Sequence, residues 1–118
     1  MKPTQFILNI TSENPEALHK FYQEVVGLEV DPVSGGFVIG ESALFAIDGH
    51  SETHGPAKEP SRALFSFAVD DAKTERERLE AQGVQFIRKE GQEFWGGKFS
   101  TFIDPDGNYA QFMEFKPE

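Results

Sequence analysis

The sequence predicts an α+β fold built from two βαβββ modules in one domain. The 118 residues contain a polar stretch at 49–61 with Gly and Pro residues and almost nothing apolar, which is typical of a linker. On each side of it, a strand pattern, a helix pattern and three more strand patterns follow in the same order. The two helix patterns also have equal lengths from cap to terminating glycine. We therefore expect one domain over 1–118, with modules at 4–48 and 62–116.

The first module begins with β-forming apolar residues at 5–10, which predict a strand. Asn14 then precedes Pro15 and Glu16, which together favour a helix start through a capping side chain, a first-turn proline and an acid at the positive end. Gly27 is expected to end this helix in a left-handed conformation. The helix face repeats every 3.6 residues, at Ala17, Leu18, Phe21, Tyr22, Val25 and Val26. Short strands are expected at 28–33, 37–39 and 43–47.

The second module repeats this order. A strand is predicted at 64–69, followed by a cap at Asp70 or Asp71, a helix over 72–82 and a stop at Gly83. The run from Asp104 to Asn108 (DPDGN) predicts a tight turn, because Pro presets φ, Gly supplies positive φ and the Asp and Asn side chains satisfy local amides. The three further strands are expected at 84–89, 98–103 and 109–115.

Composition excludes several classes of function. The chain has 20 acidic and 11 basic residues and a net charge of −9, which argues against nucleic-acid and membrane partners and favours a cationic small ligand. The absence of cysteine excludes disulfide scaffolds, thiolate metal sites and cysteine nucleophiles. No apolar run reaches the ~20 residues of a membrane span and no signal-peptide pattern opens the sequence, so we expect a cytoplasmic protein.

Alternation within the strands separates two kinds of face. One is apolar and should pack on the helices; its residues include Phe6, Leu8, Ile10, Phe65, Phe67, Val69, Ala110 and Phe112. The other mixes polar and apolar side chains, which suits a sheet lining a ligand pocket better than open solvent or a sealed core. Its residues include Gln5, Ile7, Asn9, Leu64, Ser66, Tyr109, Gln111 and Met113. The polar residues of this face could orient a ligand or form hydrogen bonds with one another or with water. Tyr109 and Met113 could contact the ligand or only fill the interior of the protein.

Taken in order, these motifs resemble the vicinal oxygen chelate (VOC) superfamily, which includes glyoxalase I, bleomycin- and fosfomycin-resistance proteins and extradiol dioxygenases. The resemblance rests on Asn14–Leu18, Phe21-Tyr22, Val26–Leu28, Phe67–Asp71, Gly83-Val84, Trp95–Gly97 and Phe102–Asn108. It implies that the modules form a curved, partly open mixed β-sheet barrel around a pocket, with the helices outside. It also implies a homodimer.

Metal-dependent members of this superfamily place one ligand on the first and last strand of each module. The resemblance maps these positions onto Gln5, Leu44, Leu64 and Gln111. Leucine cannot coordinate a metal, and amides offer neutral oxygens where divalent ions normally require carboxylate or imidazole. We therefore expect no metal, no cofactor and no catalytic residue.

The three histidines, Glu114, Trp95 and the charged residues of the second helix are not needed for a metal site, and each has a structural explanation. His19 lies outside the apolar helix stripe and is expected to be solvated, while His50 and His54 lie in the linker, where their spacing of four is a weak zinc signal. Glu114 is one position off the pocket face and is expected at the surface. Trp95 is either packed in a bend or an aromatic wall over the pocket. A solvated helix face is expected for Lys73, Glu75, Arg76, Glu77, Arg78 and Glu80.

The expected function is metal-independent binding of a small molecule. It resembles the bleomycin type of antibiotic resistance, in which a drug or metabolite is sequestered without chemistry. The alternative is a glyoxalase- or dioxygenase-like enzyme, with a metal held by Gln5, Gln111 and groups from a swapped subunit or the His50–His54 loop. A metal-free catalyst ranks last, because no Glu, Asp or His is placed as a base. The expected ligand-binding residues are Gln5, Ile7, Asn9, Leu44, Leu64, Ser66, Trp95, Tyr109, Gln111 and Met113.

Overall fold

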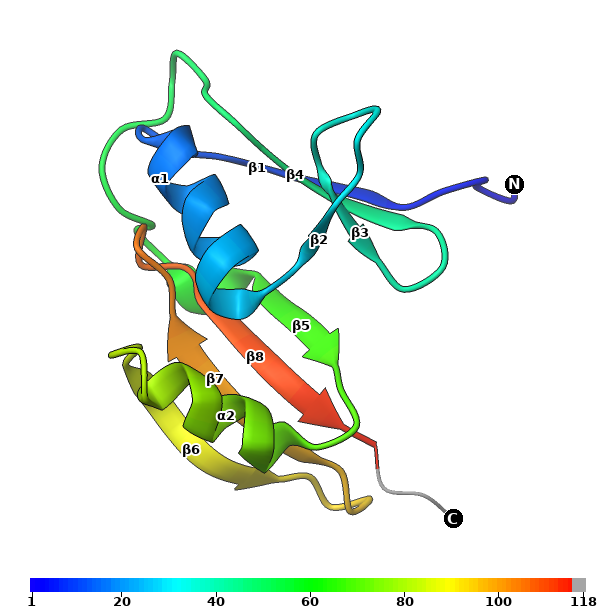
Figure 1. Cartoon of the computed structure of the whole chain (residues 1–118), viewed down its shortest axis with the longest axis vertical. Helices are drawn as coiled ribbons and strands as arrows, with labels where there is room; N and C mark the ends of the chain where they lie inside the picture. The colour runs from blue at the N-terminus through cyan, green and yellow to red at the C-terminus, as the bar shows by residue number, and fades with distance from the viewer. Residues whose placement is uncertain (116–118) are drawn as a thin grey trace. The chain divides into compact units, whose positions relative to one another are not determined.

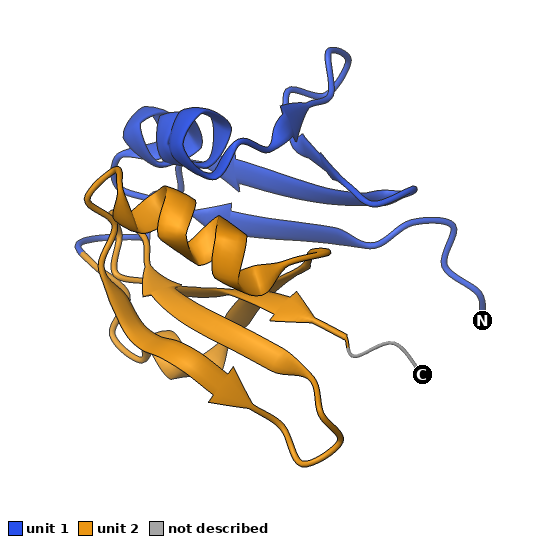
Figure 2. Cartoon of the chain, turned by 60° about the horizontal axis from the view of Figure 1, so that its bottom comes forward, with its two compact units in different colours: residues 1–55 blue, residues 56–118 orange. Residues whose placement is uncertain are grey.

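The computed structural model describes residues 1–115, which divide into two compact units (Figure 2). Unit 1 is Met1–Gly55 and unit 2 is Pro56–Glu118, so the division falls inside the stretch predicted as a linker. The predicted end of the second module at 116 lies outside the described residues. Within residues 1–115, every helix is too short or too polar to cross a bilayer.

Unit 1 contains one mixed four-stranded sheet and one helical segment (Figure 1). The strand order is β1-β4-β3-β2, with β1 parallel to β4 and the other neighbours antiparallel. The helical segment is the chain connection from β1 to the next strand. Parallel strands need such a crossover connection, because a tight turn cannot join them. The elements are β1 (Ile7–Thr11), α1 (Pro15–Lys20), η1 (Phe21–Val26), β2 (Glu29–Val30), β3 (Phe37–Ile39) and β4 (Ala43–Asp48).

Unit 2 repeats this topology, with strand order β5-β8-β7-β6 and β5 parallel to β8. The prediction of two βαβββ modules is therefore confirmed, each as a separate mixed sheet. The barrel that the resemblance implies stays a prediction. The elements of unit 2 are η2 (Pro60–Arg62), β5 (Leu64–Ala68), α2 (Ala72–Glu80), β6 (Phe86–Gln92), β7 (Lys98–Ile103) and β8 (Tyr109–Glu114).

The first helix begins and ends where predicted, but by partly different means. The Asn14 side chain makes no capping hydrogen bond, so that prediction is wrong; instead the Asn14 N–H donates to Ser12 Oγ at 2.9 Å. After Lys20 the helix widens into the π-helical turn η1, at whose end Gly27 N–H donates to Tyr22 O at 3.0 Å. Gly27 then ends the helix with φ +90°, the left-handed conformation that glycine adopts without strain.

The predicted strand at 28–33 is shortened to β2, because a turn begins at Asp31. The Asp31 N–H donates to Gly36 O at 2.7 Å, and its carboxylate accepts from Ser34 Oγ at 2.7 Å. This hydrogen bond from Ser34 lowers the pKa of Asp31. The extended run therefore stops where a side chain closes a local turn.

The core of unit 1 lies between the helical segment and the sheet. Leu18, Tyr22 and Val26 are buried on the helix side, and Phe37 and Phe45 on the sheet side. The Tyr22 and Phe45 rings meet edge to face, with centroids 5.1 Å apart. Leu18, Tyr22 and Val26 of the predicted stripe thus pack on the sheet, whereas Ala17 is exposed.

Two residues that we expected at the surface are held by specific contacts. His19 is half-buried and stacks on Phe37 at 4.5 Å between centroids, with its Nε2 3.0 Å from Gly35 O. Glu114 is also half-buried, and its carboxylate accepts a hydrogen bond of 3.0 Å from the Ala72 N–H. Both predictions relied on strand and helix periodicity, which does not show these neighbours.

In unit 2, α2 packs on β6, β7 and β8. Phe102 lies at the centre of this layer, with ring centroids 5.4 Å from Phe86 and 5.3 Å from Phe112. Asp71, one of the two predicted caps, accepts a hydrogen bond from the Thr74 N–H at 3.1 Å, which lowers the pKa of the Asp71 carboxyl. The buried apolar residues of unit 2 are Phe65, Phe67, Ala72, Leu79, Phe86, Phe99, Phe102, Ala110 and Phe112.

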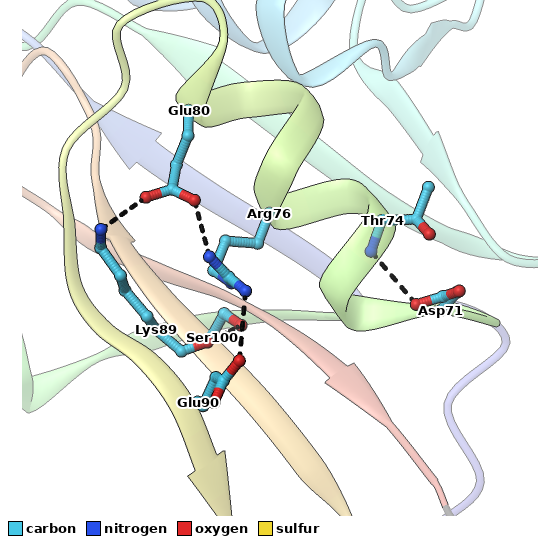
Figure 3. Close-up of polar contacts among 7 residues, drawn as sticks. All are labelled: Asp71, Thr74, Arg76, Glu80, Lys89, Glu90 and Ser100. Carbon is cyan, nitrogen blue, oxygen red and sulfur yellow. Dashed lines mark hydrogen bonds and ion pairs between the residues drawn. The ribbon is translucent and has the colours of Figure 1, made fainter.

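A polar network joins α2 to β6 (Figure 3). Arg76 is only 8% exposed and pairs with Glu80 at 2.7 Å and Glu90 at 3.4 Å, so its expected solvation is wrong. Lys89 pairs with the other oxygen of Glu80 at 2.9 Å. The hydrogen bond from Lys89, with the charges of Lys89 and Arg76, lowers the pKa of Glu80 against an opposing effect of burial. Ser100 Oγ donates to Lys89 O at 2.8 Å, which ties the network to β7.

Candidate functional site

The sheet of unit 2 has one face turned away from α2, which we call the far face. Its alternate residues, such as Phe67 and Phe112, are buried in the helix-side layer. Strand pairing defines the far face as Leu64, Ser66 and Ala68 on β5, Tyr109, Gln111 and Met113 on β8, Phe99, Thr101 and Ile103 on β7, and Arg88 on β6.

A row of four polar residues crosses the far face, one from each strand. Ser66 pairs with Gln111, Gln111 with Thr101, and Thr101 with Arg88 in the sheet register. The Gln111 amide donates to Ser66 Oγ at 2.9 Å, and Thr101 Oγ1 donates to Gln111 Oε1 at 3.2 Å. Gln111 is 8% exposed, whereas Ser66 and Arg88 are exposed. We call these residues the polar row.

Arg88 reaches the polar row because of a bulge in β6. Phe86 pairs with Phe102, but two residues later Arg88 pairs with Thr101, only one residue along β7. Strict alternation would place Arg88 beside Phe86 on the α2 side. Its guanidinium instead lies over the Phe99 ring, 4.5 Å from the centroid.

Apolar residues flank the polar row. Leu64 is 48% exposed, and Tyr109, Met113 and Ile103 are half-buried. A face of this composition can bury apolar groups of a ligand while a few polar atoms orient it.

Phe99 owes its position to a neighbouring glycine. A Cβ at Gly91 would come within 2.5 Å of the Phe99 ring, so glycine is required for the ring to lie against β6. The ring thereby supports the Arg88 guanidinium.

Most predicted ligand-binding residues of unit 2 come together on the far face: Leu64, Ser66, Tyr109, Gln111 and Met113. Trp95 does not belong to it. Its indole stacks on Phe115, with centroids 5.5 Å apart, and covers Gly97 in the turn between β6 and β7. Trp95 is 44% exposed, so its two interpretations, a packed bend or an aromatic wall, stay predictions.

The predicted residues of unit 1 lie just before β1, on β1 and on β4. Ile7 pairs with Leu44, and both lie on the face opposite the buried Phe45. Asn9 is exposed on the same side of β1. Gln5 precedes β1, is exposed and donates to Ser42 O at 2.8 Å, so its side chain is bound to the β3–β4 turn.

Strand register shows which first-strand residues lie opposite the two mapped last-strand positions. Gln111 pairs with Ser66 rather than Leu64, and Leu44 pairs with Ile7 rather than Gln5. First-strand residues two positions later thus stand opposite the last strands: Ile7 opposite Leu44, and Ser66 opposite Gln111.

These residues do not fit a divalent metal ion. Ile7 and Leu44 have no side-chain donor atom. Ser66 offers a neutral hydroxyl and Gln111 a neutral amide, whose Oε1 already accepts from Thr101. Residues 1–115 contain no group of three or more His, Asp or Glu side chains placed to hold a metal.

The linker histidines do not add to such a set. His50 Nδ1 accepts a hydrogen bond of 3.0 Å from the Glu52 N–H, and His54 Nδ1 lies 3.9 Å from Glu13.

A cavity of about 310 Å³ lies in unit 2 between the start of α2 and the β6–β7 hairpin, and it shares Phe99 with the far face. It contains none of the predicted ligand-binding residues. Two charged residues of the cavity wall already have partners: Lys89 pairs with Glu80, and Glu90 pairs with Arg76. Part of the charge that lines the cavity is therefore balanced within the protein. Its walls are Ala72, Lys73, Lys89, Glu90, Gly91, Gln92, Lys98, Phe99 and Ser100.

Comparison with known proteins agrees with this architecture. The family model described as the glyoxalase/bleomycin resistance protein/dioxygenase superfamily matches residues 5–112. A solved structure of that superfamily from Sphaerobacter thermophilus is similar with a TM-score of 0.74 and 20% identity, covering 97% of this chain and 98% of that chain.

Two further solved structures have the same fold. An integron cassette protein from the Halifax Harbour sewage outfall metagenome has a TM-score of 0.71 and 22% identity, with 97% of this chain and 100% of that chain covered. A structure described as lactoylglutathione lyase from Agrobacterium tumefaciens has a TM-score of 0.70 and 22% identity, with coverage of 97% and 96%. No curated protein sequence matches the chain.

Proposed function

Because the chain belongs to the glyoxalase/bleomycin resistance protein/dioxygenase superfamily, we propose that it binds a small organic molecule on the far face of unit 2 without a metal ion. Proteins of this superfamily bind small molecules. The polar row is the observation that supports this proposal. In the proposed role, the protein sequesters a drug or metabolite, and it does so as a homodimer.

The polar row supplies directional contacts. Gln111 uses part of its hydrogen-bonding capacity on Ser66 and Thr101 and retains a further acceptor site on its oxygen. The exposed Ser66 hydroxyl accepts from Gln111 and remains free to donate its own hydrogen. A few such bonds, at about 0.5–1.5 kcal/mol each, together with burial on Leu64 and its apolar neighbours, are enough for micromolar affinity.

Binding without chemistry is favoured by the residue types on the far face. The face carries no Asp, Glu or His that could act as a general base. The Ser66 hydroxyl is hydrogen-bonded to an amide, which does not remove its proton, so it is not an activated nucleophile.

Titration of the ¹⁵N-labelled protein with 2-naphthamide, a neutral aromatic amide, tests this proposal. We expect chemical-shift changes at the far-face residues, and a loss of affinity of about tenfold in Gln111→Leu, because the hydrogen bond that the ligand donates to the Gln111 oxygen disappears. Gln85→Leu is the matched control, since Gln85 is exposed and lies just before β6. Binding that is insensitive to Gln111→Leu would overturn the proposal.

Metal analysis provides an independent test. Protein dialysed without chelator should contain no stoichiometric Zn, Ni, Mn or Fe, and these ions should not raise its Tm, because neutral amides compete poorly with water for divalent ions. A stoichiometric metal that survives dialysis would favour the glyoxalase- or dioxygenase-like alternative. Sedimentation velocity of the same sample tests the homodimer.

A further inference from the structure

We propose that the molecule bound on the far face carries a carboxylate and that Arg88 receives it. This inference rests on the proposed function and adds the chemical class of the ligand. It starts from the position of Arg88, which the bulge in β6 places next to Thr101 in the polar row. Arg88 is the charged residue of that face.

Arg88 differs from the other arginines in its partners. Arg62 pairs with Glu59 at 2.6 Å, Arg76 with Glu80 at 2.7 Å, and Arg78 with Glu75 at 2.9 Å. In the described part of the chain, Arg88 has no carboxylate within ion-pair distance. Acidic residues outnumber basic ones by 20 to 11, so carboxylates are abundant in this protein. An unpaired, exposed arginine beside neutral hydrogen-bonding groups fits a carboxylate supplied by a ligand.

The Phe99 ring orients Arg88 for this contact. The guanidinium lies over the ring with its central carbon 4.5 Å from the centroid, so one of its flat faces is occupied by the aromatic surface. Its N–H donors lie around the rim of the guanidinium plane and stay available to a planar acceptor. Two parallel N–H···O bonds to a carboxylate are the geometry that this group favours.

The net charge of −9 favours a cationic ligand, but it is the sum over the whole protein. Most of that charge therefore acts on a bound ligand from a greater distance than Arg88 does. Exposed charges more than about 10 Å apart are largely screened at ordinary ionic strength. On the far face itself, the residues are apolar or neutral apart from Arg88. The charge in direct contact with the ligand is therefore positive, and it favours an anion.

Three probes of one shape and different charge test the proposal: 2-naphthoate, 2-naphthamide and 2-naphthylmethylammonium. Their Kd values are measured by ¹⁵N–¹H chemical-shift titration of the wild type, Arg88→Gln and Arg62→Gln. Arg62→Gln is the control, because it also removes one arginine charge. Arg62 lies at the end of η2 and forms an exposed ion pair with Glu59. We expect the wild type to bind naphthoate about five- to tenfold more tightly than the amide. Arg88→Gln should abolish that preference, and Arg62→Gln should retain it.

Arg88→Lys and salt refine the test. Lysine keeps the charge but loses the planar pair of donors, so an intermediate preference is expected. Raising the salt concentration should weaken naphthoate binding more than amide binding.

The outcomes separate this inference from the proposed function. Naphthoate binding that depends on Gln111 but not on Arg88, or tighter binding of the ammonium probe, would overturn the carboxylate assignment and leave small-molecule binding standing. If none of the three probes shifts far-face resonances, both proposals fail.

Discussion

The Gln111 side-chain amide donates a 2.9 Å hydrogen bond to Ser66 Oγ, joining the last strand of unit 2 to its first. Gln111 is 8% exposed while Ser66 is exposed, so the two ends of this bond differ in their access to water. Gln111 also accepts from the buried Thr101 hydroxyl, which makes it the central residue of the polar row.

Removing either partner of that bond should have unequal effects on stability. Gln111→Met leaves the buried Thr101 hydroxyl without its acceptor and should lower the free energy of unfolding by about 1–2 kcal/mol. Ser66→Ala should cost about 0.5 kcal/mol or less, because water can replace an exposed hydroxyl. Urea denaturation of both variants measures the difference. Equal losses would show that the hydrogen bonds of Gln111 are not what stabilises this face.

Arg76 should contribute far more to stability than Arg78, two positions along the same helix. Arg76→Ala removes a buried side chain and its pairs with Glu80 and Glu90, for which we expect a loss of about 2 kcal/mol. Arg78→Ala removes a more exposed pair with Glu75 and should cost about 0.5 kcal/mol. Chemical denaturation of the two variants measures the costs, and a smaller loss for Arg76→Ala than for Arg78→Ala would contradict the network shown in Figure 3.

Stability should fall in acid partly through Glu80. Its folded pKa lies below the ordinary value of 4.5, so ionised Glu80 stabilises the fold above that value and this contribution disappears as pH falls through the folded pKa. The Tm difference between the wild type and Glu80→Gln should therefore be constant from about pH 6 to 8 and shrink below about pH 4.5.

The control for this measurement is Glu77→Gln, an exposed glutamate on the same helix that lies outside the network. A Tm difference for Glu80→Gln that stays constant down to pH 3 would refute the role of Glu80.

Gly27 should resist substitution although space surrounds it. Its φ is +90° and a Cβ would meet no atom within 4 Å, so Gly27→Ala is opposed by backbone strain alone. We expect a loss of about 1 kcal/mol in thermal or urea unfolding. Gly49→Ala is the control, because its Cβ would make ordinary contact with Pro15 at 3.8 Å, and it should change stability by less than about 0.5 kcal/mol. Similar losses for both would argue against the left-handed cap.

Much of the fold follows from local signals in the sequence. The strands at 37–39 and 98–103 match β3 and β7, because each is a short β-forming run between turn residues. The turn at Asp104–Asn108 forms as predicted, with the Asp104 carboxylate accepting from the N–H groups of Asp106 and Asn108, both at 2.9 Å. These features are local, so a sequence pattern is enough to predict them.

The candidate site was only partly predictable. Alternation places Ser66 and Gln111 on one face, and it could also have identified Thr101, which shares its side of β7 with Phe99 and Ile103. Arg88 could not be found this way, because the bulge reverses the side on which it lies. The first-strand residue that pairs with Gln111, which is Ser66, likewise depends on where the two strands meet.

The amino-acid sequence alone determines the two repeated modules, the starts of their helices and the neutral chemistry of the residues that the resemblance maps onto metal-ligand positions. Those properties depend on propensities, periodicity and residue type, which act over a few neighbouring positions. The tertiary structure decides the strand register, the burial of Arg76 and the position of Arg88 over Phe99. These depend on pairing between distant segments, in which one inserted residue moves a side chain to the opposite face.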